Sequence, residues 1–290
     1  MSRIAATFKR LADADEGALI PYLTVGYPSL EATRQLVPVL AEQGADLIEL
    51  GVPFSDPLAD GATVQRASHA ALEQGVTLSR CLSVAAEARC STEVPLLFMS
   101  YFNPILRYGL SRFVRHCARA GVDGLIIPDL PPEEAGELKA ECEQHALDLI
   151  FLVAPTSTDE RLARVAEMAS GFIYCVSLMG VTGARTEISY DVSDMLARVR
   201  QHTDLPLVVG FGISKSEHVA QVVQGAEDGE VGAEGAVVGS ALINLIESLP
   251  DGDLTASVSK YVRNLKAATV RSPRPSSVGR TPALTAQQRD

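Results

Sequence analysis

Three carboxylates lie within one short stretch of the chain and could take part in proton transfer. Glu49 interrupts the apolar run 47–50, and Asp56 and Asp60 follow in a loop that is rich in proline and glycine. Burying an acid in an apolar run costs free energy, so an acid kept there, just before an acidic loop, is a candidate for catalysis. The alternative is that Glu49 is an ordinary strand residue whose carboxylate reaches solvent.

The surroundings of these acids predict different roles for them. The apolar neighbours of Glu49 disfavour its charged form and should move its pKa towards neutrality, so that it can both give and take a proton. Asp60 lies in the loop, where it should stay ionised and could hold an N–H donor on which positive charge develops. Asp56 could share that role, but the sequence Ser55-Asp56-Pro57 is also typical of a turn.

The elements that would position these acids alternate regularly along the chain. Apolar, β-rich runs are separated by segments with helical spacing, and the eight runs lie near residues 18–24, 46–50, 95–101, 124–128, 148–153, 171–176, 206–210 and 235–239. Such alternation predicts right-handed βαβ units and a parallel sheet. Eight units in a chain of this length fit a closed (β/α)₈ barrel better than an open sheet.

We therefore expect one α/β domain, a TIM barrel over residues 1–270, with an extra N-terminal helix at 3–13. The other helical segments include 103–120 and 132–145. The tail 271–290 is rich in Pro, Ser, Thr, Gln and Arg and has little to bury, so it is predicted to be disordered.

In such a barrel the active site lies at the C-terminal ends of the strands, so the residues at these ends are the next candidates. Tyr22, Tyr101, Tyr174 and Phe211 form an aromatic rim that would suit a flat, apolar substrate group. Asp129 follows the fourth run and either lines the pocket as a substrate-binding residue or caps the following helix, and the second interpretation is favoured.

Two glycine-containing turns after the seventh and eighth runs could bind an anion. Gly212-Ile213-Ser214 and Gly239-Ser240 would bring backbone N–H groups and a helix N-terminus to one place. Either turn alone is weak evidence, but together they match the position where many barrels bind phosphate. The connection 177–190 is long for a strand–helix loop and is predicted to be a lid over the substrate, although a flexible surface loop has the same pattern.

Other mechanisms lack the residues that they need. No histidine falls at a predicted strand end, which argues against a metal-dependent reaction, and Lys215 lies past its loop, which argues against a Schiff base. The net charge of −11 argues against binding to nucleic acid or to an anionic membrane, and no signal peptide or membrane span is recognisable. Five cysteines without a C-x-x-C pair indicate reduced thiols in a cytoplasmic protein.

The segment from Glu49 to Gly61 resembles the hallmark motif of the tryptophan synthase alpha subunit family. It reads ELGVPFSDPLADG, and further motifs follow in the family's order around Tyr101, 128–131, 180–183, 210–213 and 238–241. The resemblance covers about residues 3–268. It implies an enzyme that cleaves indole-3-glycerol phosphate to indole and glyceraldehyde 3-phosphate without a metal or a Schiff base.

The resemblance also implies roles for individual residues. Glu49 matches the acid and base that protonates the indole ring carbon and assists proton removal from the substrate hydroxyl, and Asp60 matches the carboxylate that binds the indole N–H. Tyr174 matches a pocket tyrosine near Glu49, and Thr182 matches a lid threonine that meets the loop aspartate on closure. The candidate substrate-binding residues are therefore Tyr22, Tyr101, Asp129, Tyr174 and Thr182, and the phosphate-binding positions are Gly183, Phe211, Gly212, Gly239 and Ser240.

Members of the family pair with a beta subunit that carries pyridoxal phosphate and receives the indole through a tunnel. The resemblance thus implies an alpha2-beta2 heterotetramer and no cofactor in this chain. Pro53, Asp56, Pro57 and the segment 103–109 would face the partner. The acidic stretch 225–234 departs from the family pattern and is expected to be a surface insertion at the end of the barrel opposite the site.

Two alternatives stay open at the level of sequence. Another phosphate-binding barrel, such as indole-3-glycerol phosphate synthase, would rely on a strand-borne lysine, which is not found here. A catalytically inert barrel that only activates a partner would be expected to have lost Glu49 or Asp60, and both are present.

Overall fold

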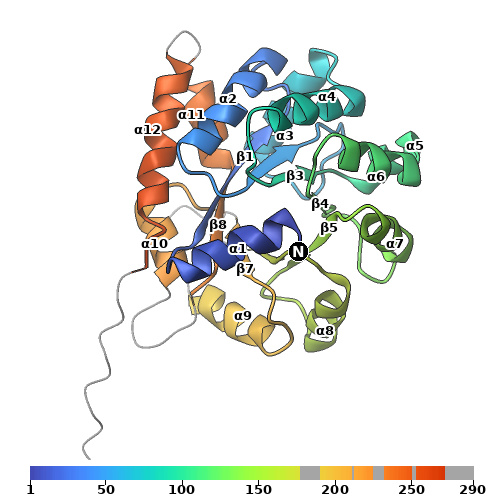
Figure 1. Ribbon diagram of the computed structural model, residues 1–290, viewed down its shortest axis with the longest axis vertical. Coiled ribbons are helices and arrows are strands. Elements are labelled where there is room, and N and C mark those ends of the chain that lie inside the picture. The colour runs from blue at the N-terminus through green and yellow to red at the C-terminus, as the bar shows by residue number, and fades with distance from the viewer. Residues whose placement is uncertain (177–189, 211, 225–231, 250–252, 272–290) are drawn as a thin grey trace, which may run out of the picture.

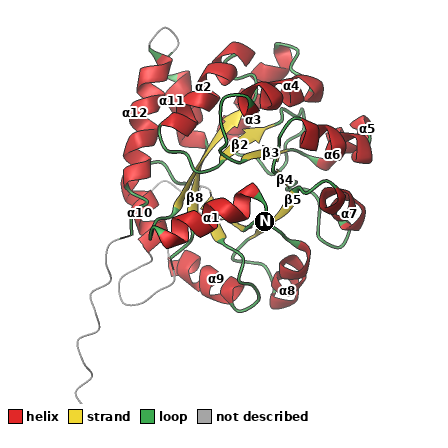
Figure 2. Ribbon diagram, viewed as in Figure 1, coloured by secondary structure: helices red, strands yellow, loops and turns green. Residues whose placement is uncertain are grey.

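The computed structural model describes residues 1–290 with the exception of 177–189, 211, 225–231, 250–252 and 272–290. In the described part of the chain, eight parallel strands form a closed barrel in chain order, and helices surround them (Figures 1 and 2). The predicted TIM barrel is therefore confirmed. The strands are β1 Ala18–Thr24, β2 Ile48–Gly51, β3 Leu96–Met99, β4 Gly124–Ile126, β5 Asp148–Val153, β6 Ile173–Val176, β7 Leu207–Gly210 and β8 Gly235–Val238.

The helix at the N-terminus closes one end of the barrel. Ile4, Phe8 and Leu11 of this helix join the apolar cluster inside the barrel, and the Phe8 ring lies 5.8 Å from that of Phe172, just before β6. This helix crosses the barrel in Figure 1, so the opposite end of the barrel is left open for a site. The helices are α1 Arg3–Asp13, α2 Leu30–Glu42, α3 Ala62–Glu73, α4 Leu78–Arg89, α5 Phe102–Tyr108, α6 Leu110–Arg119, α7 Gly136–Gln144, α8 Asp159–Met168, α9 Tyr190–Arg200, α10 Ser216–Gln224, α11 Ser240–Glu247 and α12 Leu254–Ala267.

The alternation of side chains along the strands decides which residues enter the barrel. Successive residues of a strand point to opposite faces. Ile48 and Leu50 of β2 belong to the cluster between the strands and the outer helices, and Glu49 between them therefore points into the barrel. The register places Glu49 beside Tyr22 of β1 and Leu97 of β3. A carboxylate thus lies in the barrel interior, at the second position of a four-residue strand.

Two helix predictions are wrong in detail. The predicted helix 103–120 is divided into α5 and α6, because Gly109 between them has a φ of +94°, which a helix cannot contain. The predicted helix 132–145 begins only at Gly136. The residues before it form turns in which Glu134 N–H donates to the Pro131 carbonyl, and prolines there oppose a continuous helix.

A repeated two-point clamp holds the end of the barrel that α1 covers. A leucine N–H at the start of each odd-numbered strand donates to a side chain that precedes the next strand, and the N–H of that residue donates back to the leucine carbonyl. Three of the four acceptors are carboxylates that also pair with arginine or lysine. The pairs are Leu19 with Asp46, Leu96 with Asp123, Leu149 with Ser170, and Leu207 with Glu234.

Several sequence predictions fall wholly or partly outside the described residues. Glu234 takes part in a clamp and so belongs to the barrel rather than to a surface insertion, whereas 225–231 are not described. The predicted tail is 271–290; Arg271 is described, and its N–H donates to the Asp15 carbonyl at 3.1 Å, whereas 272–290 lie outside the described residues, so the domain boundary near 270 stays a prediction. Among the helices that the structure describes, none has the length and apolarity that crossing a membrane requires.

Candidate active site

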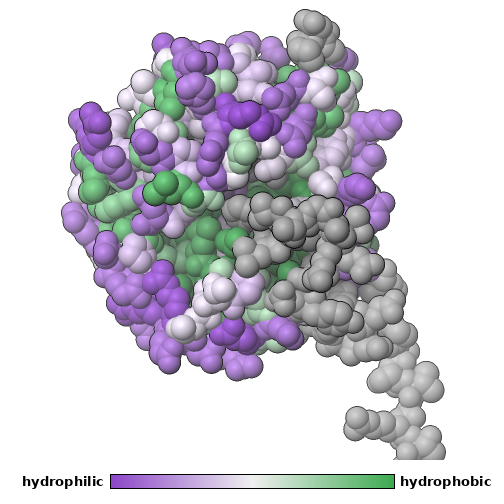
Figure 3. Space-filling view, turned by 180° about the vertical axis from the view of Figure 1, so that it is seen from behind, coloured by the Kyte–Doolittle hydropathy of each residue, from purple (hydrophilic) through white to green (hydrophobic). Residues whose placement is uncertain are grey.

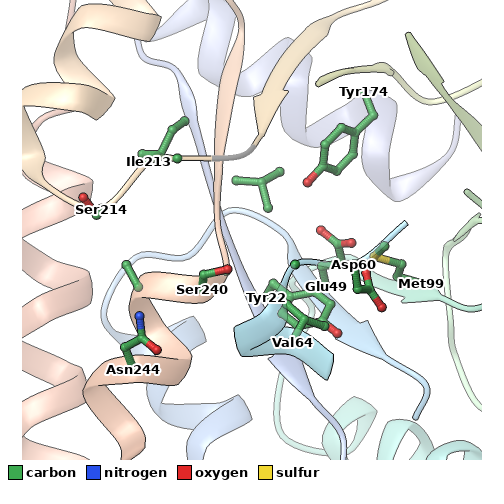
Figure 4. A pocket seen from close by; sticks show the side chains of 15 residues that line it. Tyr22, Glu49, Asp60, Val64, Met99, Tyr174, Ile213, Ser214, Ser240 and Asn244 are labelled. Carbon is green, nitrogen blue, oxygen red and sulfur yellow. The ribbon is translucent and has the colours of Figure 1, made fainter. Parts of the chain in front are cut away.

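A pocket of about 240 Å³ opens at the C-terminal end of the barrel. On the face opposite α1, apolar side chains gather in a hollow among hydrophilic ones (Figure 3). The close view in Figure 4 shows side chains that enter the pocket from strands, from α3 and α11, and from the segment after β7. The lining residues are Tyr22, Glu49, Asp60, Gly61, Val64, Met99, Tyr174, Gly212, Ile213, Ser214, Val237, Gly239, Ser240, Ala241 and Asn244.

Glu49 is a buried carboxyl group that faces this pocket. The residue has no exposed surface, and both carboxylate oxygens lack a hydrogen-bond partner among the described residues. Burial, and secondarily the charge of Asp60, raise the pKa of Glu49 to about 8. The group is therefore mostly protonated at neutral pH, and it can donate a proton into the pocket and take one back, as its apolar neighbours predicted.

Asp60 is the second carboxyl group of the pocket, and it comes from the loop between β2 and α3. Partial burial raises the pKa of Asp60 and a hydrogen bond from Tyr101 lowers it, and the net result is a pKa of about 6. The expected ionised Asp60 is thus found at neutral pH, although its pKa is higher than a loop position predicts. One pocket therefore holds a protonated and an ionised carboxyl group side by side.

Tyr22 and Tyr174 flank the two acids, from β1 and β6. Burial raises the pKa of both phenols, and the electrostatic influence of Glu49 and Asp60 reaches each of them. The rings fit because two strand residues are glycines: a Cβ on Gly51 would lie 2.0 Å from the Tyr22 hydroxyl, and one on Gly210 would lie 2.3 Å from the Tyr174 hydroxyl. Figure 4 shows the Tyr174 ring pointing into the pocket.

The N-terminus of α11 lies at the pocket, together with the segment after β7. Gly239 precedes α11 without a side-chain cap, and Ser240 is the first residue of that helix. The first-turn N–H groups of a helix point away from it and attract negative charge. Ser214, in the segment after β7, lines the same pocket as Ser240, and both are labelled in Figure 4. The predicted phosphate positions Gly212, Gly239 and Ser240 are thus brought together.

Five predicted site residues do not appear in the lining. Thr182, Gly183 and Phe211, together with the predicted lid 177–189, lie outside the described residues. Asp129 accepts the Phe102 N–H at 2.9 Å, so its carboxylate holds the start of α5 rather than the helix that follows it. Tyr101 is also absent from the lining; its hydroxyl group accepts the N–H of Ala59, which precedes the lining residue Asp60.

Several residues that line the pocket belong to no motif in the sequence. Val64 comes from the first turn of α3 and Asn244 from the second turn of α11, and Met99 and Val237 come from β3 and β8. Only Asn244 carried a usable signal, because it follows Ser240 by four residues and therefore lies on the same helix face. Within the described residues, no three His, Cys, Asp or Glu side chains lie close enough together to hold a metal ion.

The buried acid should make the free protein less stable as the pH rises. The unfolded-state pKa of Glu49 is near 4.5 and the folded-state pKa is about 8. The loss of stability is therefore absent below about pH 4.5 and grows with pH up to about pH 8. At about pH 7 it amounts to about 3 kcal/mol. Glu49→Gln cannot ionise and should raise the free energy of unfolding by about 2–3 kcal/mol at that pH.

Urea unfolding between about pH 5 and pH 8 would measure this difference. The increase in the free energy of unfolding that Glu49→Gln causes should shrink towards zero at the acid end of this pH range. The matched control is Glu137→Gln on the exposed face of α7, which should change stability by less than about 0.5 kcal/mol. A gain that is equal at every pH would contradict the burial of an ionisable Glu49.

Comparisons with known proteins agree with one another. The model of the family "Tryptophan synthase alpha chain" matches residues 8–270. The tryptophan synthase alpha chain of Roseiflexus castenholzii is 55% identical over 267 residues, which is 92% of this chain and 100% of that relative. The corresponding chain of Geobacter sulfurreducens is 47% identical over 268 residues, 92% of this chain and 99% of the relative.

Solved structures are similar over the same range. A tryptophan synthase structure from Mycobacterium tuberculosis has a TM-score of 0.84 and 39% identity, and the match covers 93% of this chain and 99% of that one. Tryptophan synthase subunit alpha from Legionella pneumophila also gives a TM-score of 0.84, at 34% identity and with 93% and 98% of the two chains covered.

Proposed function

The chain belongs to the tryptophan synthase alpha chain family, and from this membership we propose that the pocket around Glu49 and Asp60 is its active site. The chain is a lyase of L-tryptophan biosynthesis that cleaves indole-3-glycerol phosphate to indole and glyceraldehyde 3-phosphate. One observation supports this location above the others. A buried carboxyl group that has no hydrogen-bond partner among the described residues shares a pocket with a second carboxyl group and an uncapped helix N-terminus.

Glu49 serves as the acid and the base of the cleavage. In its protonated form it gives a proton to the indole ring carbon that bears the side chain, which leaves positive charge on the ring nitrogen. The resulting carboxylate then takes the proton of the neighbouring side-chain hydroxyl. The carbonyl group forms, the carbon–carbon bond breaks, and its electron pair restores the neutral indole. The pKa of about 8 favours this cycle, because both forms of Glu49 are accessible near neutral pH.

Asp60 stabilises the charge that develops between these steps. With a pKa of about 6 it is ionised when Glu49 is still protonated. An ionised carboxylate can accept the indole N–H and lower the free energy of the cationic ring. Tyr22, Tyr174 and Met99 would surround the flat ring, and the N-terminus of α11 with Gly212 and Ser240 would hold the phosphate.

We propose that this chain needs no cofactor, since its own carboxyl groups can move both protons. Its partner would be a tryptophan synthase beta subunit with pyridoxal phosphate, in an alpha2-beta2 heterotetramer. A second groove supports a docking face beside the pocket loop, and it is lined by Pro53, Phe54, Ser55, Asp56, Leu72, Thr77, Leu78, Ser79, Asn103, Pro104, Arg107, Tyr108 and Arg112. The free thiols of all five cysteines support a reducing compartment such as the cytoplasm.

Indole release from indole-3-glycerol phosphate tests the proposal. The purified chain should release indole slowly by itself and faster when a beta subunit is added without serine. A chain that released no indole under either condition, while binding the beta subunit, would be an activator and not an enzyme. Glyceraldehyde 3-phosphate should appear in equal amount, which separates cleavage from adventitious breakdown of the substrate.

A further inference from the structure

Tyr101 is buried next to the pocket, but it does not line the pocket. We propose that Tyr101 is a positioning residue, whose hydroxyl group fixes the loop that carries Asp60, and that it does not contact the substrate. The proposal rests on the proposed function, in which Asp60 binds the indole N–H. It changes the role that the sequence predicts for this tyrosine.

The hydroxyl group of Tyr101 meets the loop at two neighbouring residues. The Ala59 N–H donates to the Tyr101 oxygen at 2.9 Å. The phenol hydrogen is then left to be donated, and the Asp60 carboxylate receives it. One oxygen atom thus binds both the backbone before Asp60 and the side chain of Asp60 itself.

The loop has little else to hold it in place. Leu58 is 94% exposed and Ala59 is also exposed, so apolar packing contributes little around Asp60. The other bonds at Asp60 are local: its N–H donates to the Pro57 carbonyl at 3.1 Å, and the Gln65 side chain, five residues on in α3, donates to its carbonyl at 2.8 Å. A catalytic carboxylate must be held within a fraction of an ångström of its working position. In this part of the loop, Tyr101 supplies the long-range contact.

Tyr101 itself is held firmly from three sides. Its ring packs on that of Phe54, with centroids 5.1 Å apart and planes tilted by 31°. It is the N-cap residue of α5, and the Asp129 carboxylate binds the next N–H, that of Phe102. Ser100 donates its hydroxyl group to the Tyr101 carbonyl at 3.2 Å. The phenol is therefore a fixed point at the end of β3, against which the loop is positioned.

The same hydroxyl group also keeps Asp60 charged. Burial raises the pKa of Asp60, and the hydrogen bond from Tyr101 lowers it. Among the described residues, the other titratable groups that act on this region are Glu49 from β2, Tyr22 from β1, Tyr174 from β6 and Asp129 after β4. None of these described groups is a cation, so among them the hydrogen bond from Tyr101 is what opposes protonation of Asp60.

The variant Tyr101→Phe tests the proposal, because it removes one oxygen and keeps the ring on Phe54. Indole release by the chain without a partner should show a kcat lowered about tenfold at neutral pH, with the acid limb of the pH profile moved about one unit upwards. KM should change less than kcat. The matched control is Tyr27→Phe after β1, outside the pocket lining, which should leave the profile unchanged.

The same substitution in an Asp60→Asn background separates positioning from substrate contact. If Tyr101 acts through Asp60, Tyr101→Phe should lower kcat by less than about twofold in the Asp60→Asn background. An equal loss of kcat in both backgrounds would overturn the proposal. So would an acid limb of the pH profile that does not shift in Tyr101→Phe. Failure of the proposed function looks different, since Asp60→Asn alone would then release indole as fast as the unsubstituted chain.

Discussion

Replacing Glu49 by glutamine is expected to lower the turnover of indole-3-glycerol phosphate by about 10³-fold or more, while the substrate still binds. General acid–base catalysis contributes about 10²–10⁴-fold, and here one group would perform both proton transfers. Glutamine keeps the shape of the side chain but can neither give the proton nor take it back. Indole release gives kcat, and calorimetric titration with glyceraldehyde 3-phosphate reports whether the phosphate end of the pocket is intact.

The pH profile of the unsubstituted chain supplies the companion measurement. The active form has Asp60 ionised and Glu49 protonated, so kcat/KM should be bell-shaped, with limbs near the two pKa values of about 6 and about 8. The two carboxyl groups interact, and the limbs therefore report values of the pair. Turnover of Glu49→Gln within tenfold of the unsubstituted chain would place the proton donor elsewhere.

Replacing Asp60 by asparagine should lower kcat by about 10²–10³-fold, as expected when one preorganised electrostatic contact is removed. The amide can still lie beside the indole N–H, but it carries no charge to oppose the positive ring. The acid limb of the pH profile should disappear as well, because the group that causes it no longer titrates. Steady-state indole release over a range of pH measures both effects.

Asp56→Asn is the matched control for this variant. It makes the same chemical change in the same loop, at an exposed residue outside the pocket lining. In assays of the chain alone it should leave kcat unchanged, since Asp56 faces the groove and not the pocket. Equal losses of kcat in the two variants would indicate that the loop responds to any change of charge. The specific role assigned to Asp60 would then be wrong.

The strands were predictable because each is a short apolar run between helical segments. The prediction for β1, residues 18–24, agrees with the structure at both ends. The pKa shift of Glu49 was also predictable in direction, because the residues on either side of it are apolar. Local sequence was sufficient in these cases, since neighbours in the chain are also the neighbours that matter in space.

The rest depends on contacts between distant parts of the chain. Nothing near Tyr101 in the sequence shows that its hydroxyl group accepts the N–H of Ala59, 42 residues away. Asp129 was expected to cap the helix after it, but its carboxylate binds the N–H of Phe102 at the start of α5, which follows the neighbouring strand β3. The raised pKa of Asp60 has the same origin, because a loop residue is predicted to be solvated until the barrel places Tyr22 and Glu49 beside it.

The clamps at the α1 end imply an order in which the barrel can assemble. Each clamp joins an odd-numbered strand to the next one, over sequence separations of 27, 27, 21 and 27 residues. Such local contacts form before distant ones, because closing a short loop costs less entropy. We therefore expect two-strand modules to form first, and the pairing of Ala18 with Gly235 that completes the ring to form last. Cuts or insertions between modules, after β2, β4 or β6, should be tolerated better than those within a module.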